Sequence, residues 1–455
     1  MALSEKYKDR YFFHFTDVHN LDSIIKNGLL CTNEKNRRGI NHKNIANMGI
    51  QERRARMVVP VGPKGTVHDY VPFYFSSINP MLLTLLNQKN VDQNHIIYFC
   101  IRIQRLEKDD AVFTNASANT AVSPSFFDEI SNLDELDWKS IDSRRWSMDT
   151  DEEKHRKMAE VLIKECVRIE EIDAVVVYNR DVKRLVEAVF KKNNVTPPPI
   201  YYDYNFKKNM YSFYYTKFFI ESQKNYTLVT GPMTLKGEFC ELMTEIKENR
   251  RQKNELYPFD SIKEMVDRLD EDISILPELE AVKSLLQAYP PHNDSVGDHT
   301  RNVVSEMRQS DFFRSLSDDK RYVLLLASYL HDIGKGPLTK WKDGIMLKPY
   351  PDHPADAIPM LERILTDEIE TITDEEIRMV CLLVVYHDIV GDCMMKGRDK
   401  EQIVDVLECE EELDMLYAMS YADAKAICSS WADDIIEKWP DFKKTIMKLY
   451  KKRKG

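Results

Sequence analysis

The pattern of apolar residues changes once along this chain, and that change constrains the fold more than any other feature. Over the first 200 residues, short runs of β-branched and aromatic residues are bounded by turn-forming residues, which is typical of strands. Beyond about residue 235, apolar residues recur three and four positions apart, which is typical of helices. The expected strands are 11–15, 71–75, 96–103, 161–163 and 173–178. The sequence therefore predicts an α+β domain followed by an all-α domain.

Charge divides the chain near the same place. Residues 1–225 are slightly basic, whereas the remainder is strongly acidic and accounts for the net charge of −11. At roughly 150 residues per domain, 455 residues suffice for two large domains or three smaller ones. We predict a first domain over residues 8–225, a helical connector over 226–269 and a second domain over 270–455.

Composition and sequence pattern make several classes of protein poor candidates. Gly accounts for only 14 of 455 residues, and the glycine motifs of Rossmann and P-loop proteins are absent from the sequence. The longest apolar run, 323–330, is too short to cross a bilayer, and the first residues lack a signal-like stretch, so we expect a cytoplasmic protein without a membrane partner. The eight cysteines form no Cys-x-x-Cys pair, which indicates reduced thiols.

Two segments have compositions that suit contact with nucleic acid. Residues 34–56 combine two glutamates with Lys35, Arg37, Arg38, Lys43, Arg53, Arg54 and Arg56, and such a segment can contact phosphates. Residues 201–226 interleave tyrosines with lysines, which is the composition of a groove that stacks single strands. The alternatives are a solvated basic loop for the first segment and core or interdomain packing for the second.

The opening motif HFTDVHNLDSIIKNGLL predicts a strand followed by a short helix. Asn20 is the expected helix cap, and Gly28 is the expected stop. His14 and Thr16 lie two residues apart on the strand and therefore share a face. There they can hydrogen-bond a ribose or an amide, although such a pair also occurs for structural reasons alone.

Further segments follow this motif in a specific order. They are NIANMGIQERRARMVVPV, DYVPFYFSSINPMLL, VFTNASANTAVSPSFFDEISNLDELDW and KMAEVLIKECV. With them, residues 10–206 resemble the DarT family of DNA ADP-ribosyltransferases. The resemblance implies the α+β ADP-ribosyltransferase fold, a split pair of small antiparallel sheets with helices that clamps NAD. It also implies transfer of ADP-ribose from NAD to a base of single-stranded DNA, typically thymine, in a toxin or phage-defence system with an antitoxin protein as a further partner.

The same resemblance assigns NAD contacts to four residues. His14 and Thr16 match the strand that holds the ribose and adenine side of NAD, and Asn20 falls near the NAD contacts. Tyr74, in VPFYF, matches the aromatic residue that stacks on nicotinamide.

The resemblance also points to catalytic residues, and the chemistry requires such groups. Cleavage of the nicotinamide glycosidic bond develops positive charge on the ribose, which a carboxylate near the 2-hydroxyl stabilises. The imide nitrogen of thymine also needs a general base. Glu160, in MAEVLI, matches the catalytic glutamate. Either Arg53 or Arg54 matches the catalytic arginine, which would hold the pyrophosphate bidentately or polarise the base.

Histidine and aspartate recur at the ends of apolar helical runs in the second domain. They are His299, His331-Asp332, His353, His387-Asp388 and Asp423. Imidazole and carboxylate donors on successive helices suit Mn, Fe, Zn, Ni or Mg ions. A lone histidine at a helix end is usually a cap or a core group, but this ordered series predicts a metal site.

Over about residues 275–430 the pattern resembles the HD superfamily of metal-dependent phosphohydrolases, which are all-α domains. The resemblance assigns one ion to His299, His331, Asp332 and Asp423. It assigns a second ion, bridged by Asp332, to His353 and His387, and gives Lys335 the role of steadying a substrate phosphate.

The segment PPHNDSVGDHT narrows the expected substrate of the second domain. It is similar to the HD region of bacterial tRNA nucleotidyltransferases, so we expect a nucleotide or a 2′,3′-cyclic phosphate. Alternatively, the domain binds a nucleotide without turnover and regulates the first domain.

Overall fold

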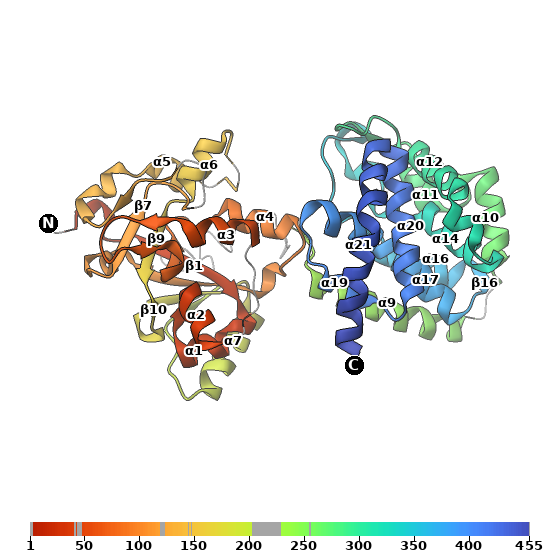
Figure 1. The fold of residues 1–455 in the computed structure, drawn as a ribbon. Helices are drawn as coiled ribbons and strands as arrows, with labels where there is room; N and C mark the ends of the chain where they lie inside the picture. Colours follow the sequence, from red (N-terminus) through yellow and green to blue (C-terminus); the bar gives the residue numbers. More distant parts are fainter. Residues whose placement is uncertain are drawn as a thin grey trace. The chain divides into compact units, whose positions relative to one another are not determined.

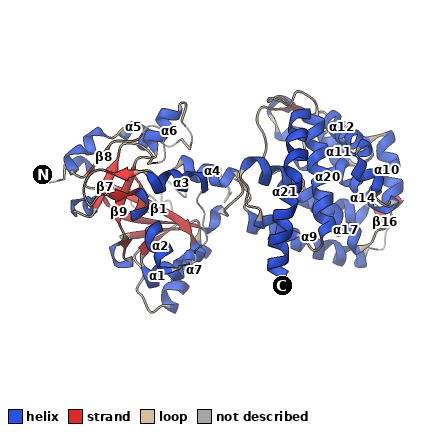
Figure 2. Ribbon diagram, in the orientation of Figure 1, coloured by secondary structure: helices blue, strands red, loops and turns tan. Residues whose placement is uncertain are grey.

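The computed structural model describes residues 3–40, 42, 48–118, 123–143, 145–146, 148–202, 229–253 and 256–454, with only the backbone described at 48–50. The chain forms two compact units, Met1–Gly231 and Pro232–Gly455, which Figure 1 shows in red to green and in green to blue. The main sheet lies in the first unit, and the second unit is mostly helical (Figure 2). The predicted order of an α+β part and a helical part is therefore confirmed, but the second unit is not all-α, because it also contains two short strand pairs.

The first unit is built on an eight-stranded sheet with the order β12-β11-β6-β1-β5-β9-β7-β8. The strands are β1 (Tyr11–Asp17), β5 (Tyr70–Tyr74), β6 (Ile96–Arg102), β7 (Ala111–Thr114), β8 (Phe126–Phe127), β9 (Glu160–Lys164), β11 (Ala174–Val176) and β12 (Ile200–Tyr201). They include all five expected strands. The expectation of two separate antiparallel sheets is corrected, because the strands form one sheet and β12 pairs with β11 in parallel.

The pairing of neighbouring strands is nevertheless least extensive at the centre of the sheet, between β1 and β5. β1 pairs with β6 along its whole length, and β5 pairs with β9 along its whole length. Between β1 and β5, however, the register consists of the single pair Phe13 and Tyr74. Tyr74 is the last residue of β5, and the earlier residues of β5 pair with β9 but not with β1. The sheet therefore consists of two well-paired halves joined at one point.

Seven helices flank this sheet in the described part of the first unit. They are α1 (Leu21–Asn27), α2 (Thr32–Arg38), α3 (Met48–Arg56), α4 (Pro80–Asn87), α5 (Trp138–Ile141), α6 (Asp151–Lys157) and α7 (Arg180–Lys192). Two short strand pairs lie beside the main sheet, β2 (Leu29–Leu30) with β10 (Cys166–Val167) and β3 (Val58–Val59) with β4 (Gly65–Thr66).

The start of α1 differs from the prediction. Asn20 makes no side-chain capping bond to α1. Instead, the Asp17 carboxylate accepts a hydrogen bond from the backbone of His19 and begins a 3-10 turn, η2 (Val18–Asn20), that leads into the helix. This turn places Asn20 inside the helical segment, where its side chain is not in the capping position. The predicted stop is correct, because Gly28 follows α1 with φ 80°, a conformation that glycine adopts at little cost.

The second unit is a bundle of helices with two short strand pairs. Its helices are α9 (Pro232–Gln252), α10 (Ile262–Glu271), α11 (Pro277–Val282), α12 (Val296–Gln309), α13 (Asp311–Ser315), α14 (Asp318–Leu330), α15 (His353–Asp356), α16 (Ile358–Asp367), α17 (Asp374–Val385), α18 (Ile389–Gly391), α19 (Glu401–Val406), α20 (Glu410–Ile427) and α21 (Ser429–Lys454). The strand pairs are β13 (Phe259–Ser261) with β16 (Ile369–Thr371) and β14 (Leu286–Gln287) with β15 (Ile345–Met346). None of the described helices combines the length and apolarity that a membrane span needs.

The core of the second unit reaches into the segment expected to be a connector. α9 buries Leu235 and Phe239, and α10 buries Met265 and Val266, in the same cluster that contains the apolar runs of α14 and α17. Because these side chains are removed from water by the second unit, most of the segment 226–269 contributes to that unit's core. α14 ends at Leu330 and α17 ends at Val385. The predicted metal ligands His331 and Asp332 therefore follow one buried helix, and His387 follows the other.

Candidate active site and candidate metal centre

A cavity of about 370 Å³ lies in the first unit beside β1 and β5. Its wall includes His14, Thr16, Asn20, Arg54 and Tyr74. The structure thus brings together five of the residues predicted for the first domain, from two strands and two helical segments. Figure 1 shows these elements, β1, α1 and α3, in red and orange.

His14 projects from β1 into the gap between the halves of the sheet. Its Nδ1 lies 2.7 Å from the carbonyl oxygen of Pro72, on β5. A carbonyl oxygen can only accept, so Nδ1 carries the proton and Nε2 is left as an acceptor. Burial lowers the pKa of His14 to about 4, so the ring is neutral near pH 7. It can therefore accept a hydrogen bond from a hydroxyl group in the cavity.

Thr16 and Asn20 form a polar pair on the same wall. The Asn20 amide donates to Thr16 Oγ1 over 3.2 Å, and both side chains are buried. His14 and Thr16 both line the cavity, and so does Phe15 between them. The uncapped start of α1 explains how Asn20 reaches Thr16, one turn earlier in the chain.

Tyr74 supplies an aromatic wall at the end of β5. Its ring stacks on Phe15, with the centroids 6.0 Å apart and the planes 15° from parallel. Burial raises the pKa of Tyr74 above its usual range, so the phenol stays protonated. Tyr74 also lies directly opposite Glu160 in the β5–β9 register, which places the aromatic ring beside the predicted catalytic carboxylate.

Arg54 and Glu160 form a buried, bidentate ion pair. Each guanidinium nitrogen, Nη1 and Nη2, donates to one carboxylate oxygen at 2.9 Å. Arg54 is 5% exposed and Glu160 is 0% exposed. Arg54 lines the cavity, whereas Glu160 lies behind it. Arg53, the preceding residue of α3, is exposed and does not line the cavity, so the structure places Arg54, and not Arg53, at the site.

A short loop after β7 also holds the Glu160 carboxylate. The backbone N–H of Ala118 donates to Glu160 Oε1 over 2.8 Å, and the Ser117 hydroxyl lies 3.4 Å from the same oxygen. On the backbone side, Glu160 N–H donates to Thr114 Oγ1. Hydrogen bonds from three directions fix the carboxylate, and sequence reasoning did not identify Thr114, Ser117 or Ala118.

Two further polar side chains in the cavity wall were also missed. His68 is 8% exposed, and its Nε2 lies 3.1 Å from the amide oxygen of Gln51, on α3. Burial and the nearby Arg54 and Lys35 charges lower the pKa of His68. The only available signal was its position, six residues before Tyr74 in the same strand-forming segment.

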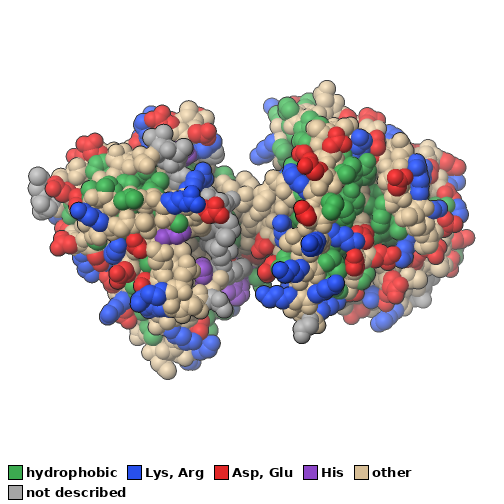
Figure 3. Space-filling model, viewed as in Figure 1, with side chains coloured by type: hydrophobic (Ala, Val, Ile, Leu, Met, Phe, Trp, Pro, Cys, Tyr) green, Lys and Arg blue, Asp and Glu red, His purple; other side chains and the backbone are tan. Residues whose placement is uncertain are grey.

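Some side chains of the basic segment 34–56 line the cavity, and others lie on the surface. Lys35 lines the cavity, whereas Arg37 and Arg38 pair with Glu34 on α2. Arg53 and Arg56 are exposed on α3. Lys43 lies outside the described residues, and so does the aromatic stretch beyond Tyr202. On the face that Figure 3 shows, basic side chains are interspersed with acidic ones.

In the second unit, the six predicted metal ligands come together in one buried cluster. His299, His331 and Asp332 have donor atoms within 4.8 Å of one another, and Asp332, His353 and His387 form a second such group. Asp332 belongs to both groups. Asp423 adds a carboxylate, since its Oδ1 lies 3.0 Å from His299 Nε2.

The orientation of the imidazoles suits a cation. Nδ1 of His331, His353 and His387 lies 2.6–2.8 Å from a backbone carbonyl oxygen three residues earlier. Nδ1 therefore carries the proton, and Nε2 presents a lone pair. The Nε2 atoms of His353 and His387 are only 3.0 Å apart. Two facing lone pairs repel, so the arrangement fits a cation held between them.

The two oxygens of Asp332 face different groups of ligands. Oδ2 lies 3.3 Å from His331 Nε2 and 3.6 Å from His299 Nε2, whereas Oδ1 lies 3.5 Å from His353 Nε2. Burial opposes ionisation of Asp332, but the neighbouring positive charge of Lys335 is the main influence that holds its pKa well below the usual range.

Lys335, Gln287 and Asp388 surround the cluster. Lys335 donates to Asp332 Oδ2 over 2.6 Å and to Gln287 Oε1 over 2.9 Å. Asp388 Oδ2 lies 3.7 Å from His353 Nε2. Sequence reasoning missed Gln287. It included Asp388 in the series of histidines and aspartates but gave it no ligand role, although Asp388 follows His387 just as Asp332 follows His331.

Comparisons with known proteins concern the first unit. A family model described as "ssDNA thymidine ADP-ribosyltransferase, DarT" matches residues 13–211. A DNA ADP-ribosyl transferase from Thermus aquaticus is 31% identical over 193 residues, which are 41% of this chain and 84% of that protein. One from Escherichia coli O127:H6 is 29% identical over 39% of this chain and 84% of that protein. A solved structure, Thermus sp. 2.9 DarT with ADP-ribosylated ssDNA, aligns with a TM-score of 0.39 and 28% identity over 44% of this chain and 95% of that chain.

Proposed function

The chain belongs to the DarT family through its first unit, and from this we propose that it transfers ADP-ribose from NAD to a base, thymine by preference, in single-stranded DNA. The observation that carries the proposal is the buried Arg54–Glu160 pair beside a cavity that His14, Thr16, Asn20 and Tyr74 line. The matching family model covers residues 13–211, which include every residue named here for the cavity and the ion pair.

The cavity offers a suitable group for each part of NAD. Neutral His14 and the Thr16–Asn20 pair can hydrogen-bond ribose hydroxyls, and the Tyr74 ring can stack on nicotinamide. The Arg54 guanidinium reaches the cavity and suits the pyrophosphate. When the pyrophosphate attracts Arg54, a carboxylate oxygen of Glu160 is released toward the ribose.

The reaction replaces one glycosidic bond by another. The bond between ribose C1′ and nicotinamide breaks, and nicotinamide leaves with the bonding electron pair. A new bond forms between C1′ and a nitrogen of the DNA base. The proton of that nitrogen passes to a general base. Glu160 stabilises the positive charge on the ribose in the transition state, where its interaction is strongest, and it can also accept the proton.

The direct test is incubation of the full chain with NAD and short single-stranded DNA or RNA oligonucleotides, followed by mass spectrometry. We expect a mass increase of one ADP-ribose on thymine-containing DNA, with release of nicotinamide. Oligonucleotides that lack thymine serve as the control. A product on protein alone, or on RNA alone, would contradict the proposal.

The low pKa of His14 predicts that NAD affinity barely changes with pH. Because the charge of His14 changes near pH 4, the dissociation constant at pH 5.5 should stay within about twofold of that at pH 7.5. A histidine with the usual pKa of about 6.5 would weaken binding about tenfold over this range. Equilibrium titration of NAD decides between them, and His14→Gln, which does not titrate, is the matched control.

Arg53 and Arg56 on α3 are expected to contact the DNA backbone. They are exposed on the helix that directs Arg54 into the cavity. Each phosphate contact with single-stranded DNA contributes about 0.7 to the slope of log affinity against log salt. Arg53→Gln with Arg56→Gln should therefore lower that slope by about 1.4. Arg184→Gln, an exposed arginine on α7, is the control, and an unchanged slope in the double variant would leave α3 outside the DNA interface.

We propose a second activity for the second unit, an HD-type phosphohydrolase that acts on a nucleotide or nucleic-acid phosphoester. Its support is the buried cluster of His299, His331, Asp332, His353, His387 and Asp423. Two divalent ions held there would activate water and neutralise charge on the phosphate. Asp332 is suited to bridge them, because its oxygens face different histidines.

Lys335 supplies a group that can bind a substrate phosphate at this second site. Its ammonium group already donates to Asp332 and Gln287, which fixes its position beside the expected ions. A third N–H remains for a substrate phosphate oxygen. Gln287 thus acts as a positioning residue, since its amide oxygen holds Lys335 in place.

A nucleotide phosphohydrolase screen on the full chain separates hydrolysis from sensing. We expect release of phosphate, or opening of a 2′,3′-cyclic phosphate, that Asp332→Ala abolishes. The alternative, in which the unit binds a nucleotide without turnover and regulates the first unit, predicts no hydrolysis and a change in base modification when the nucleotide is added.

A further inference from the structure

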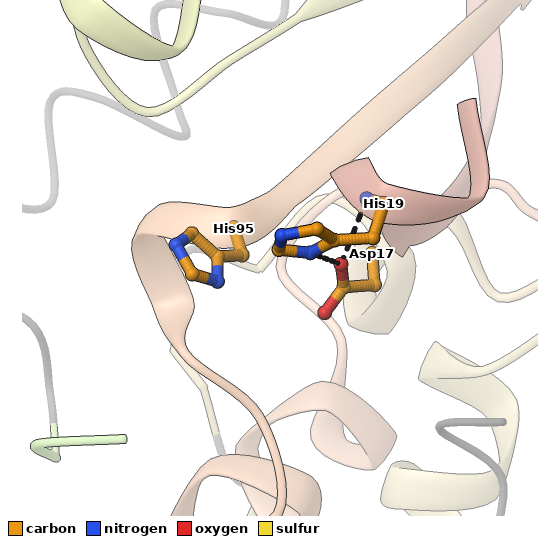
Figure 4. A group of neighbouring side chains, drawn as sticks. All are labelled: Asp17, His19 and His95. Atoms are coloured by element: carbon orange, nitrogen blue, oxygen red, sulfur yellow. Dashed lines mark hydrogen bonds and ion pairs between the residues drawn. The ribbon is translucent and has the colours of Figure 1, made fainter. Parts of the chain in front are cut away.

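A third group of possible metal ligands lies in the first unit, and it shares no residue with the two groups of metal ligands in the second unit. Asp17 ends β1, His19 lies in the turn η2, and His95 ends the short turn η4 (Gln93–His95) that leads into β6. Asp17 lies opposite Ile96 in the β1–β6 register, so the sheet itself brings Asp17 next to His95. The three side chains meet at this corner, as Figure 4 shows.

The donor atoms are close enough to share an ion. One carboxylate oxygen of Asp17 and one ring nitrogen of each histidine lie within 4.8 Å of one another. Asp17 Oδ1 lies 2.6 Å from His19 Nδ1 and also accepts the His19 backbone N–H at 2.9 Å. The two imidazole rings lie edge to face, with centroids 5.1 Å apart. Figure 4 shows the His19 ring between Asp17 and the His95 ring.

Burial and access also favour an ion. Asp17 is fully buried, whereas the His19 side chain is 49% exposed, so an ion can enter from solvent and reach an anchored carboxylate. Donors about 3.3 Å apart suit a tetrahedral ion with bonds near 2.0 Å. Asp17 Oδ1 and His19 Nδ1 are 2.6 Å apart, and rotation of the half-exposed His19 ring separates them enough to admit the ion between them.

We propose that Asp17, His19 and His95 bind one divalent ion of the Zn²⁺ class in the first unit. Two imidazoles and one carboxylate are a ligand set that Zn²⁺ accepts, with a fourth position for water. The ion replaces the shared proton between Asp17 and His19.

The position of the ion links it to the cavity. Asp17 and His19 are interleaved in the chain with Thr16 and Asn20, which bond to each other in the cavity wall. An ion on Asp17 and His19 fixes the turn η2 and therefore the Thr16–Asn20 pair. Bound Zn²⁺ should then tighten NAD binding, and NAD should tighten Zn²⁺ binding by the same factor. The coupling between Zn²⁺ and NAD rests on the proposed function, whereas the Zn²⁺ site itself does not.

Zn²⁺ titration of the metal-free full chain tests the site. In an Asp332→Ala background, which removes the bridge of the second unit's cluster, we expect one remaining Zn²⁺ per chain with micromolar affinity. His19→Ala and His95→Ala should each weaken it at least 30-fold, whereas His155→Ala, on α6, should leave it unchanged. Circular dichroism confirms that each variant is folded, and Co²⁺ in place of Zn²⁺ should give the strong visible absorption of a tetrahedral site.

The possible outcomes test the Zn²⁺ site, its coupling to NAD and the proposed function separately. If His19→Ala and His95→Ala keep the Zn²⁺ stoichiometry and affinity of the background, the site does not exist. If Zn²⁺ binds as expected but leaves NAD affinity unchanged, the coupling is wrong while the site stands. Base modification is scored separately, so its absence would overturn the proposed function without affecting the Zn²⁺ result.

Discussion

Glu160→Gln should lower the rate of DNA base modification by about 10³-fold or more. Gln keeps the size of the side chain and a hydrogen bond to Arg54, but it has no negative charge for the ribose in the transition state. NAD affinity should change little, because Glu160 lies behind Arg54 rather than in the cavity wall. Single-turnover modification of a labelled oligonucleotide and NAD titration measure the two effects.

Two controls make this result specific. Glu170→Gln replaces an exposed glutamate of the same unit and should modify DNA at the wild-type rate. Removal of one partner of a buried ion pair costs about 3–5 kcal/mol when the other charge is left uncompensated, so the melting temperature of Glu160→Gln must be compared as well. A folded Glu160→Gln protein with undiminished activity would remove Glu160 from the mechanism.

Asp332→Ala should release two metal ions per chain, and His353→Ala should release one. Asp332 faces both groups of ligands, whereas His353 belongs to only one. The remaining set of His299, His331, Asp332 and Asp423 still offers four ligands to one ion in His353→Ala. Elemental analysis of the purified wild type and both variants measures the differences.

The matched control for this experiment is His292→Ala. His292 lies beside His299, with ring centroids 5.7 Å apart, but it is not one of the six clustered ligands. Its replacement should leave the ion count unchanged. If His353→Ala retains as many ions as the wild type, the site holds a single ion, and the bridging role of Asp332 is excluded.

The predictable features of this chain depend on local pattern. The expected strands occur because short runs of β-branched and aromatic residues favour strands, and β6 and β9 bury almost every side chain of such a run. Gly28 ends its helix because its backbone adopts φ 80°. The series from His299 to Asp423 was visible because most of its members follow or open a helix, and because histidine and aspartate recur in it in order. Where the pattern was ambiguous, prediction failed: Asn20 suits a helix cap by residue type, but Asp17 begins the turn instead.

The sequence by itself determined the two units, their secondary structure and the kinds of residue at both sites, because these follow from periodicity and side-chain chemistry. The tertiary structure alone decided that Arg54 faces Glu160 while Arg53 faces solvent, since the choice depends on the rotation of α3 against the sheet. It also joined the expected separate sheets at Phe13 and Tyr74 and brought His95 to Asp17. Contacts between residues so distant in sequence depend on strand register and packing, which local pattern does not specify.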